Sequence, residues 1–349
     1  MSFCTRLGAL LALSTDLLFN ANVSAQELKF KVIGQPLATG NIQKNKEQPF
    51  FESLAKNTGL PIVFEYKPID TLGIKETEQL RVMKSGLFEM VSLRVSQNSR
   101  DEPTLLGMDL VGASPDYATG RKISDAWLST VDERLQKQFN MKLLGVWPFG
   151  PQMLFCKKTI GKIGDIKGMK VRVADQGMAK FIELIGGTPV PMAFGEVHQA
   201  LSLGVVDCAI TGPSSANSAA WSEVTTHQLP LGFQLGYNGY GISLKAWNQL
   251  KPDQQATLKK AIDGLLDDIW AYSELLFNDA LNCNAGKDPC TTGKKYNLVT
   301  VPVSAADVET VRGAVDKVSF PAWAEVCDKT NPGCSAAWKA KVGPLAGMK

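Results

Sequence analysis

Arg172 is the residue whose type and position most clearly suggest chemistry. It stands in an otherwise apolar run, Met169 to Val173, of the kind that forms a buried strand. A guanidinium offers two parallel N–H donors that match a carboxylate, which a lysine cannot do. Because a buried charge is costly without a partner, the position predicts either a structural ion pair at a strand end or a site for a ligand carboxylate.

The residues that most enzymes need are scarce. Only two histidines occur, His198 in a predicted helix and His227 in a predicted loop, and both are interpreted as surface residues. G-x-S-x-G, H-E-x-x-H, Walker A and G-x-G-x-x-G motifs are absent, so we expect no catalytic set, no metal site and no cofactor. The 349 residues carry a net charge of only +3, which disfavours a nucleic-acid partner.

Alternating strands and helices surround this arginine. In the N-terminal part of the chain, the pattern predicts strands at 28–32, 62–66 and 88–95, with helices between them at 49–57 and 76–84. Further along the chain, it predicts strands at 153–156, 169–173 and 205–210, an extended piece at 189–192, and helices at 179–185 and 196–203. This order predicts parallel sheets covered by helices, and the length suffices for two such domains.

The most regular element is a helix predicted from Pro252 to Cys283. Its apolar residues recur at spacings of three and four: Leu258, Ile262, Leu265, Ile269, Tyr272 and Leu276. Such a helix is about 48 Å long. It is long enough to brace both domains, although a core helix of one domain is the alternative.

Three ordered segments carry a family resemblance: 164–173, 186–197 and 200–207. They read Gly164-Asp-Ile-Lys-Gly-Met-Lys-Val-Arg-Val, Gly186-Gly-Thr-Pro-Val-Pro-Met-Ala-Phe-Gly-Glu-Val and Ala200-Leu-Ser-Leu-Gly-Val-Val-Asp. The chain resembles the DctP-type substrate-binding proteins of tripartite ATP-independent periplasmic (TRAP) transporters, most densely from Trp147 to Trp221. The resemblance implies an α/β, two-lobed periplasmic binding protein fold (type II-like) with a long helix spanning both lobes.

The family architecture also implies where the lobes divide. Lobe I is expected to contain residues 26–149 plus 237–278, and lobe II residues 150–236 plus 279–349. The lobes are expected to close on a ligand around the crossover strands and the long helix.

The resemblance assigns roles to individual residues. Arg172 is the expected clamp for the ligand carboxylate, and Phe194 is an expected aromatic wall of the pocket. Thr211 takes the place of an asparagine that the family commonly has, and Gln152 takes the place of an additional arginine.

Three further residues complete the expected ligand site. Arg94 either replaces part of the missing charge or is an ordinary surface arginine, and Trp147 and Phe149 either wall the pocket or belong to the core. Together these residues predict an organic acid with an apolar or aromatic body, or a 2-oxo acid, rather than a highly hydroxylated sugar acid.

The resemblance implies a periplasmic protein that captures an organic-acid anion and delivers it to a TRAP membrane permease, and we expect a monomer. Three alternatives stay open: an ABC-type binding protein, a secreted enzyme acting on a carboxylated substrate, and a receptor-associated sensor. The missing nucleophile and base argue against the enzyme.

The N-terminus reads as a signal peptide over residues 1–25. Arg6 precedes an apolar stretch from Leu7 to Leu13, and Val23-Ser-Ala25 suits cleavage. A buried N-terminal helix is the alternative. Outside this segment, no stretch of about 20 apolar residues suggests a membrane span.

Six cysteines follow residue 25, in a compartment where disulfides form. The simplest pairings are Cys283–Cys290 and Cys327–Cys334, although a four-thiolate zinc site is an alternative. Cys156 and Cys208 lie in apolar runs, where a third bridge and buried free thiols are both open.

Overall fold

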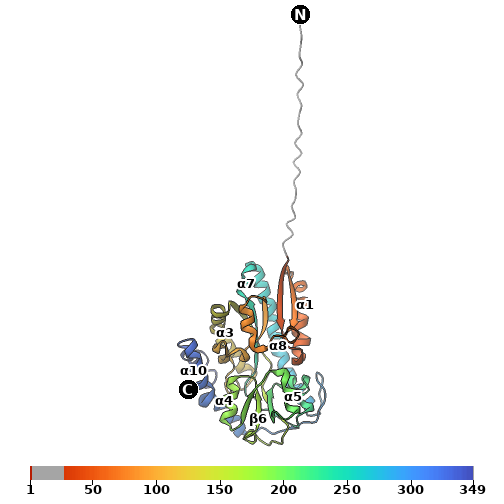
Figure 1. Ribbon diagram of the computed structural model, residues 1–349, viewed down its shortest axis with the longest axis vertical. Helices are drawn as coiled ribbons and strands as arrows, with labels where there is room; N and C mark the ends of the chain where they lie inside the picture. The colour runs from red at the N-terminus through yellow and green to blue at the C-terminus, as the bar shows by residue number, and fades with distance from the viewer. Residues whose placement is uncertain (2–26, 349) are drawn as a thin grey trace.

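The computed structural model describes residue 1 and residues 27–348, and it forms two stacked lobes (Figure 1). The expected signal peptide, residues 1–25, lies outside the described residues apart from Met1. Within the described part, no helix combines the length and the apolar character that a membrane span requires.

Lobe I is built on a five-stranded sheet in the order β2-β1-β3-β10-β4. Its elements are β1 (Leu28–Gly34), α1 (Gln48–Thr58), β2 (Ile62–Pro68), α2 (Gln79–Lys84), β3 (Met90–Arg94), α3 (Tyr117–Phe139), β4 (Met141–Pro148), β10 (Tyr237–Ser243) and α7 (Leu244–Gln249). β1 pairs in parallel with β2 and β3, as the alternating pattern predicts. β10 returns from the other lobe and runs antiparallel to both β3 and β4, so the sheet is mixed rather than parallel throughout.

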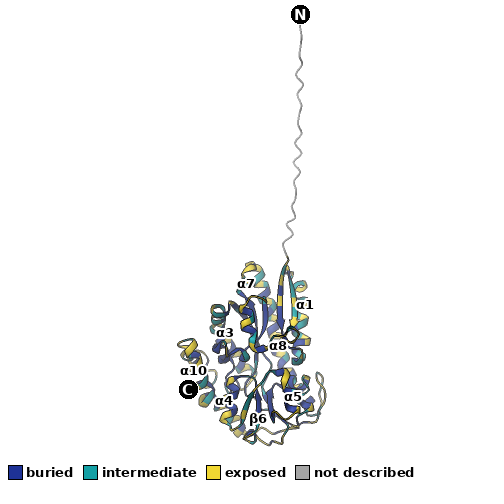
Figure 2. Cartoon of the chain, in the orientation of Figure 1, coloured by how far each residue is buried: buried dark blue, intermediate teal, exposed yellow. Residues whose placement is uncertain are grey.

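Lobe II is built on a six-stranded sheet in the order β11-β9-β5-β8-β6-β7. Its elements are β5 (Met153–Cys156), β6 (Lys170–Val173), α4 (Gln176–Leu184), β7 (Thr188–Pro191), α5 (Val197–Ser202), β8 (Cys208–Thr211), α6 (Pro213–Ser218), β9 (His227–Leu229), β11 (Val299–Thr300) and α9 (Ala305–Arg312). β6 is parallel to β7 and β8, whereas β5 is antiparallel to β8 and β9. Figure 2 shows both sheets as the buried centres of their lobes.

His227 differs from its expected place. It begins strand β9 and is buried, whereas a surface loop was expected. Its Nδ1 lies 2.7 Å from the Thr226 hydroxyl, so a local hydrogen bond satisfies this ring nitrogen.

The long helix α8 extends from Pro252 to Asn284, one residue beyond the prediction. Five of the six expected face residues are buried, and Tyr272 is half-buried. Residues up to Leu276 pack into the core of lobe I, and Phe277 and Leu281 pack against a core of lobe II. One helix therefore braces both lobes, as Figure 1 shows.

The end of the chain packs first on lobe II and then mainly on lobe I. Leu298, Val301, Val311 and Ala314 belong to cores of lobe II, whereas most buried residues of 315–342 belong to the core of lobe I and Val318 packs on lobe II. We call residues 315–342 the C-terminal arm; it contains a π-helical turn η10 (Val315–Ser319) and helices α10 (Phe320–Thr330) and α11 (Cys334–Lys341). The buried aromatic rings of the arm, Phe320, Trp323 and Trp338, belong to the same core as the lobe I sheet, although the expected division placed all of 279–349 in lobe II.

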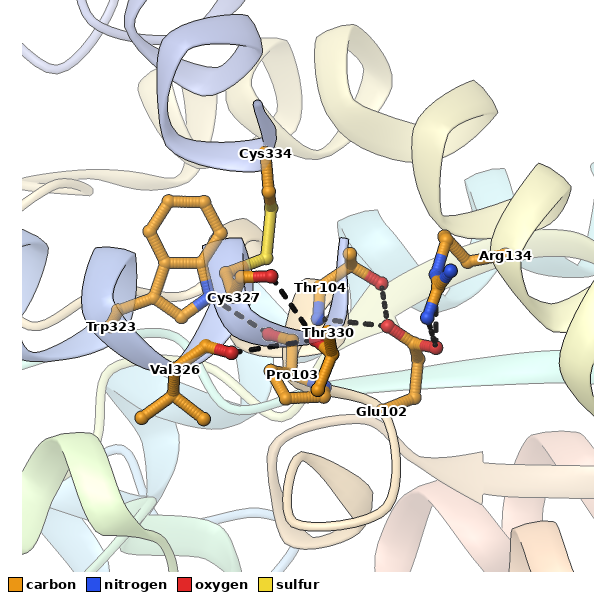
Figure 3. A network of polar contacts seen from close by, with 9 residues as sticks. All are labelled: Glu102, Pro103, Thr104, Arg134, Trp323, Val326, Cys327, Thr330 and Cys334. Atoms are coloured by element: carbon orange, nitrogen blue, oxygen red, sulfur yellow. Dashed lines mark hydrogen bonds and ion pairs between the residues drawn. A yellow bond between two sulfur atoms is a disulfide. The ribbon is translucent and has the colours of Figure 1, made fainter. Parts of the chain in front are cut away.

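Two tryptophans fix the arm. Trp323 Nε1 donates to Pro103 O at 2.8 Å (Figure 3), and Trp338 Nε1 donates to Gly107 O at 2.6 Å. Both acceptors lie in the 3₁₀ segment η6 (Pro103–Met108) of lobe I. Buried indole N–H groups need such partners, so these bonds set the position of α10 and α11.

All six described cysteines form disulfides. Cys283–Cys290 and Cys327–Cys334 are paired as predicted, which removes the zinc alternative for these four residues. Cys156 and Cys208 are also paired, and they stand directly opposite each other on the antiparallel strands β5 and β8. The third-bridge alternative is therefore the one that the structure contains.

Replacing Cys156 and Cys208 together with alanine is expected to lower the free energy of unfolding by about 4 kcal/mol, because this bridge closes a long segment of the unfolded chain. It spans 52 residues, whereas Cys283–Cys290 spans 7. The matched control, Cys283→Ala with Cys290→Ala, should lose only about 2 kcal/mol. Urea denaturation of both double variants measures the difference, and equal losses would contradict it.

Candidate functional site

A cavity of about 40 Å³ lies between the two lobes, where several strands end. Arg94 is the last residue of β3, Thr211 is the last of β8, and Ala174 directly follows β6. All three line the cavity. Ligands of open α/β sheets bind outside the carboxyl ends of their strands, so this is the expected place for a site.

Arg94 faces the cavity from lobe I with donors to spare. Only 8% of its surface is exposed, and its Nε and Nη2 atoms are buried without a hydrogen-bond partner. Its guanidinium carbon lies 4.3 Å from the centroid of the Phe149 ring, a cation–π arrangement. Burial lowers the pKa of Arg94, and the charges of Glu76 and Glu47 oppose that shift. The alternative of an ordinary surface arginine is therefore wrong.

Arg172 lies in β6, directly behind the wall of the cavity. Only 2% of its surface is exposed. Its Nε and Nη2 donate to Met192 O at 3.1 and 3.0 Å, and its Nη1 donates to Ile210 O at 2.9 Å. A guanidinium carries five N–H groups, so two remain after these three bonds. Burial lowers the pKa of Arg172 to about 10; Glu76 opposes this shift and the charge of Arg94 adds to it.

Arg94 and Arg172 are the two buried arginines among residues 27–348, and neither forms an ion pair. Arg81, Arg121 and Arg134 form ion pairs, and Arg100 and Arg312 are exposed to solvent. A buried charge is stable only when it is paired or hydrogen-bonded. Two buried, unpaired guanidinium groups next to one cavity make a place for an anion.

Aromatic side chains form apolar parts of the wall. Phe194 is buried and lines the cavity, and the Trp221 ring packs behind it with 5.2 Å between centroids. Phe149 lines the opposite side. Trp147 does not reach the cavity; it is fully buried in the core of lobe I, 4.6 Å from the Phe149 ring. Of the two alternatives open for Trp147, the core is the one observed.

Gln152 and Thr211 both line the cavity, from lobe II. The Gln152 amide nitrogen donates to Gly150 O at 2.8 Å and to Leu235 O at 3.4 Å, so both of its N–H groups have partners within the protein. Its side chain also packs against Gly236, where an added Cβ would lie 2.7 Å from the Gln152 amide nitrogen and where φ is +67°. Only glycine fits this close approach at a left-handed position.

The two crossover segments between the lobes are themselves parts of the wall. Phe149 N donates to Gly236 O at 2.9 Å, and Gln152 N donates to Gln234 O at 2.7 Å. The Asp109 carboxylate accepts from Leu235 N and from Gly236 N, each at 2.9 Å. Burial raises the pKa of Asp109 to about 7, although both amides oppose the shift. A movement of the lobes about these segments therefore changes the cavity directly.

The structure brings together six of the seven predicted site residues, five in the wall and Arg172 behind it. Several polar wall residues were not predicted: Thr39, Ser96, Gln97, Ser215, Gln234 and Tyr237. Gln234 and Tyr237 stand on either side of Leu235-Gly236 in the second crossover. A glycine among polar residues was the only feature of the sequence that could have pointed to this part of the wall.

Comparison with known proteins gives the family. The family model described as bacterial extracellular solute-binding protein, family 7 (DctP), matches residues 33–275. The C4-dicarboxylate-binding periplasmic protein DctP of Rhodobacter capsulatus is 26% identical over 264 residues, which cover 73% of this chain and 77% of that protein.

Solved structures share the fold. A TRAP periplasmic solute-binding protein of Desulfovibrio salexigens, with bound orotic acid, superposes with a TM-score of 0.79 at 17% identity, covering 91% of this chain and 99% of that one. DctP7 of Bordetella pertussis, a receptor binding pyroglutamic acid, gives 0.77 at 16% identity, covering 89% and 99%. Because the family model matches more than half of the sequence, this chain belongs to the DctP family of bacterial extracellular solute-binding proteins, the substrate-binding proteins of TRAP transporters, and it is not an enzyme.

Proposed function

We propose that this protein captures a small organic-acid anion in the periplasm and delivers it, as a monomer, to a TRAP membrane permease. The observation that carries the proposal is the pair of buried guanidinium groups, Arg94 and Arg172, which have no ion-pair partner among residues 27–348. An acid ligand supplies the missing negative charge. Export through a signal peptide over residues 1–25 is part of the same proposal.

The ligands of related proteins support the choice of an acid. C4-dicarboxylates, orotic acid and pyroglutamic acid appear in the names of the relatives, and each is a carboxylic acid. In this chain the bidentate geometry of a guanidinium suits a carboxylate better than it suits a neutral sugar.

The placement of the two arginines couples binding to closure. Arg94 belongs to lobe I and Arg172 to lobe II, and the charge of Arg94 acts on Arg172 across the cleft. Two like charges oppose closure when nothing lies between them. An anion held between them is bound more tightly by the closed form, so binding shifts the population toward closure.

The wall favours a compact acid with a flat or apolar body. Phe149, Phe194 and Tyr237 present aromatic surface to the cavity. These aromatic walls suit a ring acid or an apolar 2-oxo acid better than a sugar acid, whose many hydroxyls need more polar partners.

A panel of acids tests both levels of the proposal. Thermal unfolding with orotate, pyroglutamate, an apolar 2-oxo acid and galacturonate should show the largest shift with one of the first three. At a hundredfold excess over Kd, the ligand adds about 2.7 kcal/mol of stability. Stabilisation by galacturonate alone would reject the ligand class. Native mass spectrometry of freshly purified protein, combined with the panel, tests the proposed function itself. The proposal is rejected if no acid is found bound to the protein and no acid of the panel stabilises it.

A further inference from the structure

A second and larger pocket, which we call the side pocket, lies next to the cleft. Its volume is about 300 Å³, and it is formed where three parts of the chain meet. Arg100 and Leu106 belong to lobe I, Gly177 belongs to the first turn of α4 in lobe II, and Ser319 and Trp323 belong to the C-terminal arm. A pocket of this size holds a small organic molecule.

The walls of the side pocket are mainly apolar and are held in place. Pro103, Leu106 and Trp323 supply apolar surface. The hydrogen bond from Trp323 Nε1 to Pro103 O joins two of these walls, as Figure 3 shows. The Cys327–Cys334 disulfide, in the same view, fixes the far end of α10. The pocket is therefore preformed, so a ligand does not have to order it.

The pocket is also lined by two cationic side chains, Arg100 and Lys180, and by the hydroxyl residue Ser319; Lys180 is paired with Glu183. Ser319 is only 2% exposed, and its hydroxyl is buried without a hydrogen-bond partner. Arg100 lines the pocket, is exposed, and forms no ion pair with any residue that the structure describes. Buried hydroxyls are normally hydrogen-bonded, and a free guanidinium next to apolar walls suits an acidic group on an apolar body.

We propose that the side pocket is a second binding site, for a small aromatic or aliphatic acid that is not the transported cargo. The apolar body lies against Leu106 and Trp323, and the acidic group meets Arg100 and the Ser319 hydroxyl. The site stands on these contacts alone and does not depend on what the cleft binds.

The position of the pocket predicts coupling to the cleft, and this part rests on the proposed function. Two short stretches of chain contribute to both pockets. Gln97 and Ala174 line the cleft cavity, and Ser99 and Gln176, each two residues further on, line the side pocket. An occupant of the side pocket touches both lobes, so it binds the open and closed forms differently. By reciprocity, each ligand then changes the affinity for the other.

The probe for the test is 8-anilinonaphthalene-1-sulfonate, an aromatic anion whose fluorescence rises in apolar surroundings. Titration of the purified protein should show one saturable site. Ala322→Phe, which fills the pocket from α10, should weaken probe binding at least about tenfold, a change of 1.4 kcal/mol. Ala340→Phe, an equal addition at an exposed position of α11, should leave it unchanged.

Charge variants decide the outcome even if Ala322→Phe does not fold. Arg100→Gln should weaken probe binding about tenfold, and Arg312→Gln, an exposed arginine outside the pocket, should not. Arg172→Lys should still bind the probe, since Arg172 does not line the side pocket. No probe binding by the wild-type protein, equal binding by Arg100→Gln, or loss in Arg172→Lys would each overturn the site. Probe binding without any effect of a cleft acid would overturn the coupling alone.

Discussion

Replacing Arg172 with lysine is expected to weaken binding of the acid ligand by about 2–5 kcal/mol, which is at least about thirtyfold in Kd. The charge is kept, so electrostatic attraction alone does not explain the loss. What is lost is the planar fork, which donates to Met192 O and Ile210 O while two N–H groups remain for a carboxylate. A lysine ammonium has three donors on one atom and cannot reach both carbonyls and the ligand.

Isothermal titration calorimetry with an acid identified by the panel measures this loss. Arg121→Lys is the matched control, because Arg121 is an exposed arginine that is paired with Asp267 and does not line the cavity. The control should bind the acid with unchanged Kd. Some loss of stability without ligand is also expected for Arg172→Lys, since Met192 O and Ile210 O lose donors. Unchanged affinity in Arg172→Lys would remove Arg172 from the site.

Elements with a strong local pattern could be predicted from the sequence. The helix expected at 252–283 is observed at Pro252–Asn284, and the strand expected at 153–156 is observed with the same ends. Both elements depend on a pattern within a short stretch of sequence: one apolar face in the helix and one short apolar run in the strand. Arg172 was noticeable for a similar reason, as a charge that interrupts such a run.

Features that depend on distant partners could not be predicted. The Cys156–Cys208 bridge follows from the register of β5 against β8, which no local pattern contains. The return of the C-terminal arm to lobe I depends on indole N–H groups meeting carbonyls more than two hundred residues earlier. Each of these requires the tertiary arrangement to be known first.

The two open alternatives for wall residues show the same limit. Trp147 and Phe149 are two residues apart, so a strand would place them on one face. β4 ends at Pro148, and Phe149 therefore leaves the sheet and reaches the cavity while Trp147 stays in the core. For Arg94, every residue of β3 is buried, so its sequence shows no alternation between apolar and polar faces. Without that alternation, a cleft-facing Arg94 could not be distinguished from a surface arginine.

Replacing Arg94 with methionine is expected to have opposite effects on stability and on binding. Without ligand, the free energy of unfolding should rise by about 1–3 kcal/mol, because the substitution removes the Nε and Nη2 atoms, which are buried without hydrogen-bond partners in the wild-type protein. A methionine of similar length can pack on the Phe149 ring that the guanidinium covers. Affinity for the acid should fall at least about thirtyfold, since Arg94 supplies the positive charge of lobe I.

Arg94→Lys separates the two effects, because it keeps a charge in the cavity but cannot make a bidentate contact. Its stability without ligand should stay near that of the wild-type protein, and its affinity should lie between those of the wild-type protein and Arg94→Met. Urea denaturation without ligand and calorimetry with ligand measure both quantities. If Arg94→Met is less stable than the wild-type protein, then Arg94 is a structural residue. If it is more stable and binds the acid weakly, the protein keeps an unpaired charge in its cavity because the ligand provides the partner.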